Sequence, residues 1–272
     1  MSDLIPLEDK FADIVGKSMR GLKLSAAEVA SRAGLSESAV SALGEGSFDA
    51  TAARAVAPVL GLGAEALLAA GLEAWKPEPV AVAGLACFNT VFEDMTVNSY
   101  LAYDKSSASA VAFDTGADCS AMLAFIEKER LSLKLILLTH THADHILDLA
   151  KLHKATGAPA YTSDREPTAG AEPISPGHSF ACGALSIETR STWGHSQGGI
   201  TYVIRGLERP VAVVGDAVFA GSMGGGGVSY ADALRTNKSY ILSLPDNTVL
   251  CPGHGPLTTV GEEKKHNPFF SA

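Results

Sequence analysis

The chain has few cysteines, few aromatic residues and no long apolar run. None of its four cysteines lies in a C-x-x-C spacing, so reduced thiols are expected and neither a zinc knuckle nor a disulfide framework is indicated. No stretch approaches the length of a membrane span, and the start Met1-Ser2-Asp3-Leu4 lacks the basic-then-apolar pattern of a secretory signal. These absences predict a cytoplasmic protein with no membrane association.

Positive charge is also scarce. The 272 residues include 21 Lys and Arg against 30 Asp and Glu, which gives a net charge of -9 and argues against general affinity for nucleic acid or anionic membranes. Apolar residues make up 46% of the chain and charged residues 19%, as in an ordinary globular protein. The length is sufficient for one large or two modest domains and for the core of an enzyme.

The first 75 or so residues are alanine-rich and helical in pattern, and they end at Trp75-Lys76-Pro77-Glu78-Pro79, whose prolines indicate a linker. We predict a small all-α domain over 1–76, a linker over 77–84 and a larger domain over 85–272. The segment Leu24–Gly46, with helix caps at Ser25 and Ser36, resembles the helix-turn-helix of Cro and phage repressors. Two further helices are expected, over Thr51–Leu60 and Ala64–Ala70.

Charge disfavours DNA as the partner of this helical domain. Acidic residues outnumber basic ones up to Trp75, and the presumed recognition helix, Glu37–Leu43, contains no Lys or Arg. Helices rich in Ala and Leu need an apolar surface to cover. We therefore expect the domain to form a homo-oligomer or to cap an active site.

The stretch Thr139–His145 places three imidazoles and a carboxylate directly after the strand-like apolar run Leu133–Leu138. His140 and His142 are two apart and project to the same side of extended backbone, while Ala143–Lys154 is helical in pattern. Imidazole and carboxylate are common metal ligands. The stretch therefore predicts a metal site, and a solvated histidine-rich loop is the alternative.

Three more residues of ligand type lie further along the chain. His195 is in Trp193–Ser196, Asp216 follows Val213-Val214-Gly215, and His254 follows Cys251-Pro252-Gly253. Each borders an apolar, strand-like run and has a glycine neighbour, which lets the backbone turn closely around an ion. We expect these side chains to join the first cluster.

With these residues the chain resembles the metallo-β-lactamase-fold superfamily, whose signature is HxHxDH, then a later His, a later Asp and a final His. The resemblance extends from about Gly84 to the C-terminus. It implies an α/β (α+β) fold, an αββα sandwich of two sheets flanked by helices. The segments Gly215–Ser222, Pro252–Gly255, Thr259–Glu263 and Asn267–Pro268 look like the glyoxalase II and persulfide dioxygenase branch.

The pattern of apolar residues agrees with such a mixed architecture. Strands are expected at Val91–Ala102, Ala110–Phe113, Leu185–Thr189, Gly199–Ile204, Val211–Val214 and Val249–Cys251, and an amphipathic helix at Asp118–Arg130.

The resemblance further implies two divalent ions, with zinc as the first expectation and iron or manganese as alternatives. Asp216 would bridge the ions, and Asp144 and Asp216 would take part in catalysis by a metal-bridging hydroxide. Asp114 would fix the tautomer of a ligand histidine or cap the turn before Gly116. One ion would be held by His140, His142 and His195, and the other by Asp144, His145 and His254.

Three functions remain open. The first is a metallohydrolase acting on a thioester or related acyl compound, similar to glyoxalase II. In that family basic residues hold the glutathione carboxylates, whereas here the glycine run 224–227 stands where an arginine is expected. The glycine run predicts a mobile rim of the active site. Arg235 and Lys238 are candidates to replace the missing positive charge. The second is a mononuclear iron persulfide dioxygenase, which would use His140, His195 and Asp216. The third is a metabolite-sensing, DNA-binding regulator.

Overall fold

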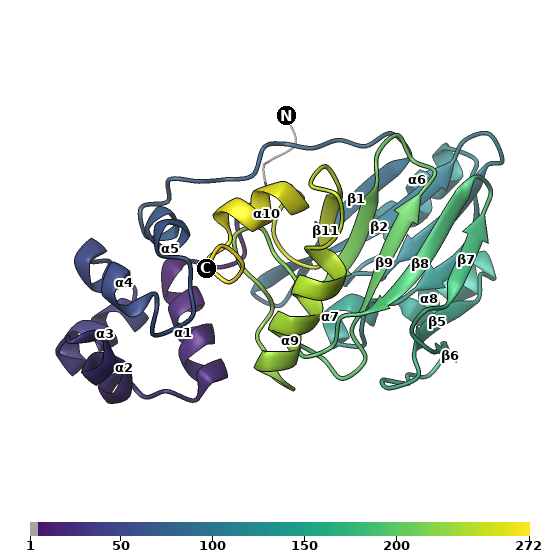
Figure 1. Cartoon of the computed structure of the whole chain (residues 1–272). Helices are drawn as coiled ribbons and strands as arrows, with labels where there is room; N and C mark the ends of the chain where they lie inside the picture. Colours follow the sequence, from purple (N-terminus) through teal and green to yellow (C-terminus); the bar gives the residue numbers. More distant parts are fainter. Residues whose placement is uncertain (1–4) are drawn as a thin grey trace.

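Two six-stranded sheets face each other, and helices cover the outer side of each sheet (Figure 1). The structure, a computed structural model, describes residues 5–272. The αββα sandwich expected from the sequence is confirmed. The secretory-signal prediction concerns residues 1–4, which lie outside the described range. Within residues 5–272, no helix has both the length and the apolar character that crossing a bilayer requires.

The first sheet has the order β1-β2-β3-β4-β5-β6, with β1, β2 and β3 antiparallel and the pairs from β3 to β6 parallel. The second sheet has the order β12-β11-β10-β9-β8-β7, in which β10 and β11 run parallel and the other neighbours run antiparallel. The strands of the first sheet are β1 Leu85–Phe92, β2 Met95–Asp104, β3 Ser109–Phe113, β4 Ser132–Leu137, β5 Ala160–Ser163 and β6 Glu172–Ile174. Those of the second are β7 Ser179–Cys182, β8 Leu185–Ser191, β9 Ile200–Arg205, β10 Val211–Gly215, β11 Val249–Pro252 and β12 Thr258–Thr259.

Side-chain alternation along buried strands builds three apolar layers. In β10, Val211 and Val213 face the core between the sheets, whereas Ala212 and Val214 face the helices outside. The outer layer of the first sheet packs under α6 and α8, and that of the second packs against η1 and α10. The covering helices are α6 Ser120–Lys128, α8 Leu149–Thr156, η1 Asn237–Ile241 and α10 Val260–His266; α9 spans Tyr230–Thr236.

The N-terminal part is helical, as the sequence predicts. Ser25 and Ser36 cap α2 and α3 by accepting hydrogen bonds from the backbone N–H of Glu28 and Ala39, at 3.3 and 3.2 Å. Whether this arrangement acts as a DNA-binding helix-turn-helix stays a prediction. The helices are α1 Phe11–Leu22, α2 Ala26–Ala33, α3 Glu37–Gly44, α4 Ala50–Val56 and α5 Ala64–Gly71.

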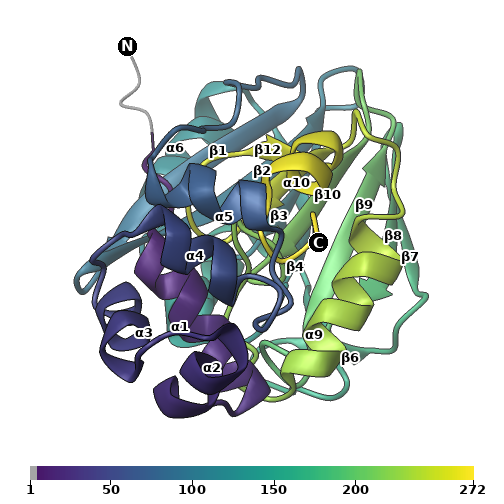
Figure 2. The same ribbon diagram turned by 60° about the vertical axis from the view of Figure 1, so that its left-hand side comes forward.

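The N-terminal helices share a hydrophobic core with the C-terminal part of the chain. Val15 and Leu67 belong to the same buried cluster as Met223, Tyr230 and Phe269. Figure 2 shows α1, α4 and α5 in front of the sandwich, with α9 and α10 beside them. The boundaries at 76 and 84 stay predictions, and so does association of copies through this region; its apolar face is in part covered by the chain itself.

The segment between α5 and β1 lies along α10. The Trp75 ring stacks on the His266 imidazole at 5.0 Å, and the backbone N–H of Glu78 donates to Glu262 at 2.9 Å. These contacts fix the proline-containing segment against the larger part of the chain.

Two elements differ from the sequence prediction. The strand expected over Val91–Ala102 is interrupted by a turn at Glu93 and Asp94, where Glu93 has φ 53°, so that a β-hairpin replaces one strand. The helix expected over Ala143–Lys154 is divided into α7, Ala143–Ile146, and α8. Asp148, at the division, accepts a hydrogen bond from the backbone N–H of Cys119 at 2.8 Å and so ties the chain to the start of α6.

Candidate metal centre

The ligand-type side chains lie where strands end. His140 follows β4, Asp216 follows β10, His254 follows β11, and His195 lies in the loop between β8 and β9. Because β10 and β11 are parallel neighbours, their carboxyl ends meet at one edge of the sheet. His142 precedes α7, which carries the remaining two predicted ligands, Asp144 and His145. The structure brings all seven predicted ligands together.

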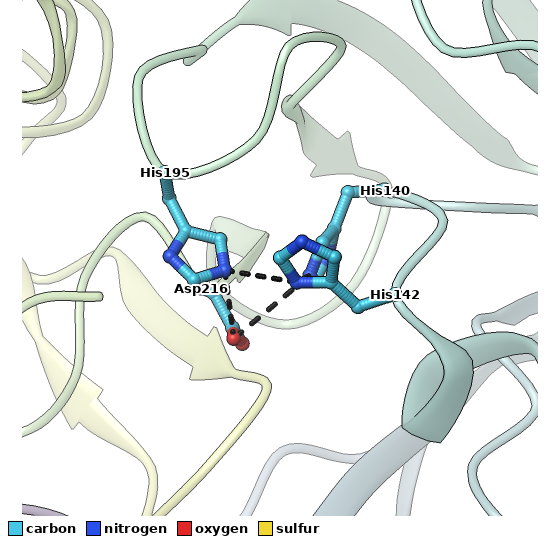
Figure 3. A group of neighbouring side chains, drawn as sticks. All are labelled: His140, His142, His195 and Asp216. Carbon is cyan, nitrogen blue, oxygen red and sulfur yellow. Dashed lines mark hydrogen bonds and ion pairs between the residues drawn. The ribbon is translucent and has the colours of Figure 1, made fainter. Parts of the chain in front are cut away.

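Four of them form the first group, shown in Figure 3: His140, His142, His195 and Asp216. Nδ1 of His142 lies 3.0 Å from Nε2 of His140 and 3.1 Å from Nε2 of His195. Nε2 of His195 lies 3.3 Å from a carboxylate oxygen of Asp216. Nitrogens around a tetrahedral zinc ion stand roughly 3.3 Å apart. The spacing of the group therefore suits a transition-metal ion.

Asp144, His145 and His254 form the second group. An Asp144 oxygen lies 3.4 Å from Nε2 of His145 and 3.3 Å from Nε2 of His254. All three residues are buried, with side-chain exposures of 0 to 12%, so an ion held there would be largely screened from water.

Asp216 stands between the two groups. Its Oδ1 lies 3.3 Å from Nε2 of His145, and its Oδ2 lies 3.3 Å from Nε2 of His195 and 3.5 Å from Nε2 of His254. Oδ2 thus faces one histidine of each group, and Oδ1 faces the second group as well. This is the position of a bridging ligand.

Buried atoms without hydrogen-bond partners support metal occupancy. Nε2 of His145 and Oδ1 of Asp216 face each other at 3.3 Å, but neither atom makes a hydrogen bond of good geometry among the described residues, and a buried polar atom left in this state is costly. A Cβ placed on Gly253 would stand 2.2 Å from Oδ1 of Asp216, so only glycine leaves this space open. The donor set and its unpaired atoms fit divalent cations.

Hydrogen bonds fix which nitrogen each histidine offers. Nδ1 of His195 donates to the carbonyl of Gly225 at 2.9 Å, and Nδ1 of His254 donates to the carbonyl of Thr96 at 2.7 Å. Since these Nδ1 atoms carry the protons, Nε2 is left as the ligand atom. His142 differs, because its Nδ1 faces His140 and His195 and is therefore its expected ligand atom.

Asp114 is the residue that orients His145. Its Oδ2 lies 2.8 Å from Nδ1 of His145 and 2.7 Å from the Thr139 hydroxyl, and its Oδ1 accepts from the Thr139 backbone N–H at 2.7 Å. The Thr139 hydroxyl in turn lies 3.0 Å from Nδ1 of His140. Of the two roles expected for Asp114, the structure shows the one that fixes ligand histidines.

Burial and charge set the protonation of the cluster. Burial lowers the pKa of His140 and of His195 below their usual range, which leaves both rings neutral and able to bind a cation. Burial would also lower the pKa of His145, but the charges of Asp216 and Asp114 outweigh it and raise that pKa to about 10. Binding of an ion by His145 therefore displaces a proton.

Sequence reasoning missed Glu166, which connects two ligand loops. Its carboxylate accepts hydrogen bonds from the backbone N–H and hydroxyl of Thr141, at 3.1 and 2.8 Å, and from the backbone N–H of Gly198 at 2.7 Å. Thr141 lies between His140 and His142, and Gly198 follows His195 by three positions. No motif surrounds Glu166, so only spatial proximity could reveal this role.

Two other sequence predictions concern the surroundings of the site. Arg235 is exposed and pairs with Asp232 at 2.7 Å, and Lys238 is exposed; neither contacts a ligand residue. The glycine run, predicted as a mobile rim, contacts the predicted ligands, and its mobility stays a prediction. Besides the Gly225 bond to His195, a Cβ on Gly224 would stand 2.0 Å from the carbonyl oxygen of Asp216.

The profile of the metallo-beta-lactamase superfamily matches residues 93–254, which is more than half of the chain. The chain belongs to this superfamily. Membership accounts for the two facing sheets and implies divalent metal ions at the strand ends described above.

Named relatives are similar over the same region. Hydroxyacylglutathione hydrolase GloC of Haemophilus influenzae is 26% identical over 200 residues, which cover 64% of this chain and 93% of that protein. Among solved structures, the BLEG-1 B3 metallo-beta-lactamase is 28% identical with a TM-score of 0.61 and covers 69% of this chain and 100% of its own. ETHE1 from Myxococcus xanthus is 25% identical with a TM-score of 0.60 and covers 67% of this chain and 83% of its own.

Proposed function

We propose that the protein is a dinuclear metallohydrolase acting on a thioester or related acyl compound. The observation that carries the proposal is the position of Asp216, whose Oδ2 lies between His195 of the first ligand group and His254 of the second. A site for one ion would not need the second, fully assembled group of Asp144, His145 and His254. The similarity to GloC supports the acyl substrate class.

The residues of the site have separable tasks. Divalent ions, when bound, supply a water of lowered pKa as nucleophile and polarise the acyl carbonyl. With ions bound, Asp216 would offset the repulsion between the two cations, and Asp144 would add a second negative charge on the side of His254. No Ser or Cys nucleophile is required.

The site is open on one side. His142 is exposed and His195 is partly exposed, whereas the ligands of the second group are buried. A small-molecule substrate would therefore approach from the side of His142. Because neither Arg235 nor Lys238 contacts the site, glutathione is a poor fit and an acyl compound without several carboxylates is favoured.

The test combines elemental analysis of the purified protein with a panel of thioesters, lactones and a persulfide. We expect two metal equivalents per chain and hydrolysis of a thioester, and we expect Asp216→Ala to lose both metal retention and turnover. Full turnover by Asp216→Ala would refute the mechanism. A single iron per chain with oxygen consumption on a persulfide would establish the dioxygenase alternative, which uses His140, His195 and Asp216.

The regulator alternative has its own test. Salt-sensitive, sequence-selective DNA binding in a gel-shift assay would support it, and absence of binding at low salt would end it. The acidic character of the N-terminal helices makes absence the expected result. We also propose that the metallohydrolase is cytoplasmic and forms a homo-oligomer. Cell fractionation tests the location, and analytical sedimentation tests the oligomeric state.

A further inference from the structure

The loop after Asp216 contacts both halves of the metal centre. Phe219 lies edge-on to the His254 imidazole, with ring centroids 5.6 Å apart, and the Gly225 carbonyl accepts the hydrogen bond from His195. The loop Phe219–Gly225 therefore touches one ligand of each group and begins beside the ligand that both groups share.

The N-terminal part of the chain holds this loop. Nζ of Lys17, in α1, donates to the carbonyl of Met223 at 2.9 Å and lies 5.1 Å from the centroid of the Phe219 ring. Lys17 also pairs with the Asp9 carboxylate, which accepts a hydrogen bond from the Ser222 hydroxyl. Lys17 and Asp9 are both largely buried, at 14% and 8% side-chain exposure, so water does little to weaken these contacts.

Neighbouring contacts place the same segment against the rest of the centre. The backbone nitrogen of Glu8 would be 3.2 Å from a Cβ on Gly255, the residue after His254. Ser18, which follows Lys17, lies 3.2 Å by its hydroxyl from the Tyr230 hydroxyl at the start of α9. The N-terminal segment and α1 thus contact the Phe219–Gly225 loop, the turn of His254 and the helix that follows the loop.

We propose that Lys17, together with Asp9, is a positioning residue of the metal centre. It holds the loop Phe219–Gly225 so that His195 and His254 keep the orientation that binds the ions. The N-terminal helices consequently form part of the enzyme's metal-binding structure. They do so whatever the substrate is, so the inference does not depend on the reaction proposed above.

The test measures metal affinity rather than turnover. Lys17→Met keeps an unbranched side chain of similar length but removes the charge over the Phe219 ring and the donor to Met223. Because partners that orient ligands typically contribute a factor of 10 to 100 in metal affinity, we expect binding to weaken about tenfold in chelator competition. The measurement uses the full chain well below its unfolding temperature, and Lys17→Arg should recover part of the affinity.

Arg54→Met is the matched control. Arg54 also pairs with a carboxylate, Glu65, but this pair is exposed and lies within the N-terminal helices. We expect unchanged metal affinity for this variant. If Lys17→Met folds and binds metal like the native protein, the proposal is wrong. Should Lys17→Met fail to fold, Ser222→Ala decides: it removes only the hydroxyl bound to Asp9, and native metal affinity in this variant overturns the proposal.

Discussion

At the scale of single residues, the metal centre depends on side chains that do not themselves face the ions. Asp114 orients His145 and Thr139, and Glu166 connects the loops of His140 and His195. Their carboxylates accept hydrogen bonds from several donors at once, which fixes the surrounding backbone as well as the rings. A ligand set of the right composition would be less well ordered without them.

Replacing Asp114 by Asn should weaken metal binding by a factor of about 10 to 100, because the amide cannot accept from His145 and Thr139 in the same way. Chelator competition measures the change. Asp118→Asn is the control, since Asp118 is an exposed carboxylate that binds Ser120 and Lys151 away from the ligands. Equal metal affinity for Asp114→Asn and the native protein would contradict this role.

Glu263 is a second residue whose environment has a measurable consequence. Burial raises its pKa to about 8, although Asn267 and Thr258 donate hydrogen bonds to it. The native state therefore retains a proton that the unfolded chain releases near pH 4.5, the usual value for this group. The stability that Glu263 contributes is present below about pH 4.5 and is lost as the pH rises toward 8.

We predict that Glu263→Gln removes this dependence. Urea unfolding of both proteins between pH 5 and 9 measures this. The unfolding free energy of the variant minus that of the native protein should increase as the pH rises and level off above about pH 8. A difference that is the same at every pH would show that Glu263 does not titrate in this range.

At the scale of elements, close packing of helix on helix joins the two parts of the chain. Gly21, near the end of α1, faces the ring of Tyr230 in α9, and a Cβ there would stand 2.3 Å from Cγ of Tyr230. The contact requires glycine, even though glycine weakens a helix. The approach of α1 to α9 thus takes precedence over local helix preference.

Gly21→Ala should lower the free energy of unfolding by about 1–3 kcal/mol, because overpacking outweighs the gain in helix propensity. Gly44→Ala, at the end of α3, is the matched substitution: a Cβ there meets nothing within 4 Å, so stability should stay equal or rise by up to about 1 kcal/mol. Urea titration of both variants measures the effect. Similar stability changes for the two would argue against tight packing at Gly21.

At the scale of the whole molecule, we expect metal binding and folding to be coupled. The seven predicted ligand residues come from segments between His140 and His254, and the loop that contacts two of them is in turn bound by Lys17 of α1. Ions that bind only this assembled arrangement stabilise the native state.

Removal of metal should therefore lower the unfolding temperature of the whole chain. Each ion present at 100 times its dissociation constant contributes about 2.7 kcal/mol. Thermal unfolding monitored by circular dichroism, before and after a chelator and again after zinc is restored, measures the shift. Asp216→Ala should show no shift with the chelator; a native protein equally unaffected would mean that the ions add nothing to stability.

The sequence determined the superfamily, the sandwich fold and the identity of the seven clustered residues, because HxHxDH and the later His, Asp and His occur in fixed order next to strand-like runs. The alternation of side chains along strands and the helix caps at Ser25 and Ser36 depend on neighbouring residues, so they could be recognised from the sequence. Such local patterns did not reveal the turn at Glu93, where the backbone has a positive φ, or the division between α7 and α8, where Asp148 binds the distant backbone N–H of Cys119.

Only the tertiary structure decided how the predicted ligands are oriented and which part of the chain the N-terminal helices contact. Glu166 and Lys17 act on residues 25 and 206 positions away, through bonds to Thr141 and to Met223, and no spacing in the sequence encodes such pairs. The physical reason is that a hydrogen bond between distant segments depends on how the intervening chain packs. The ligand atoms follow from residue type, whereas their geometry follows from the fold.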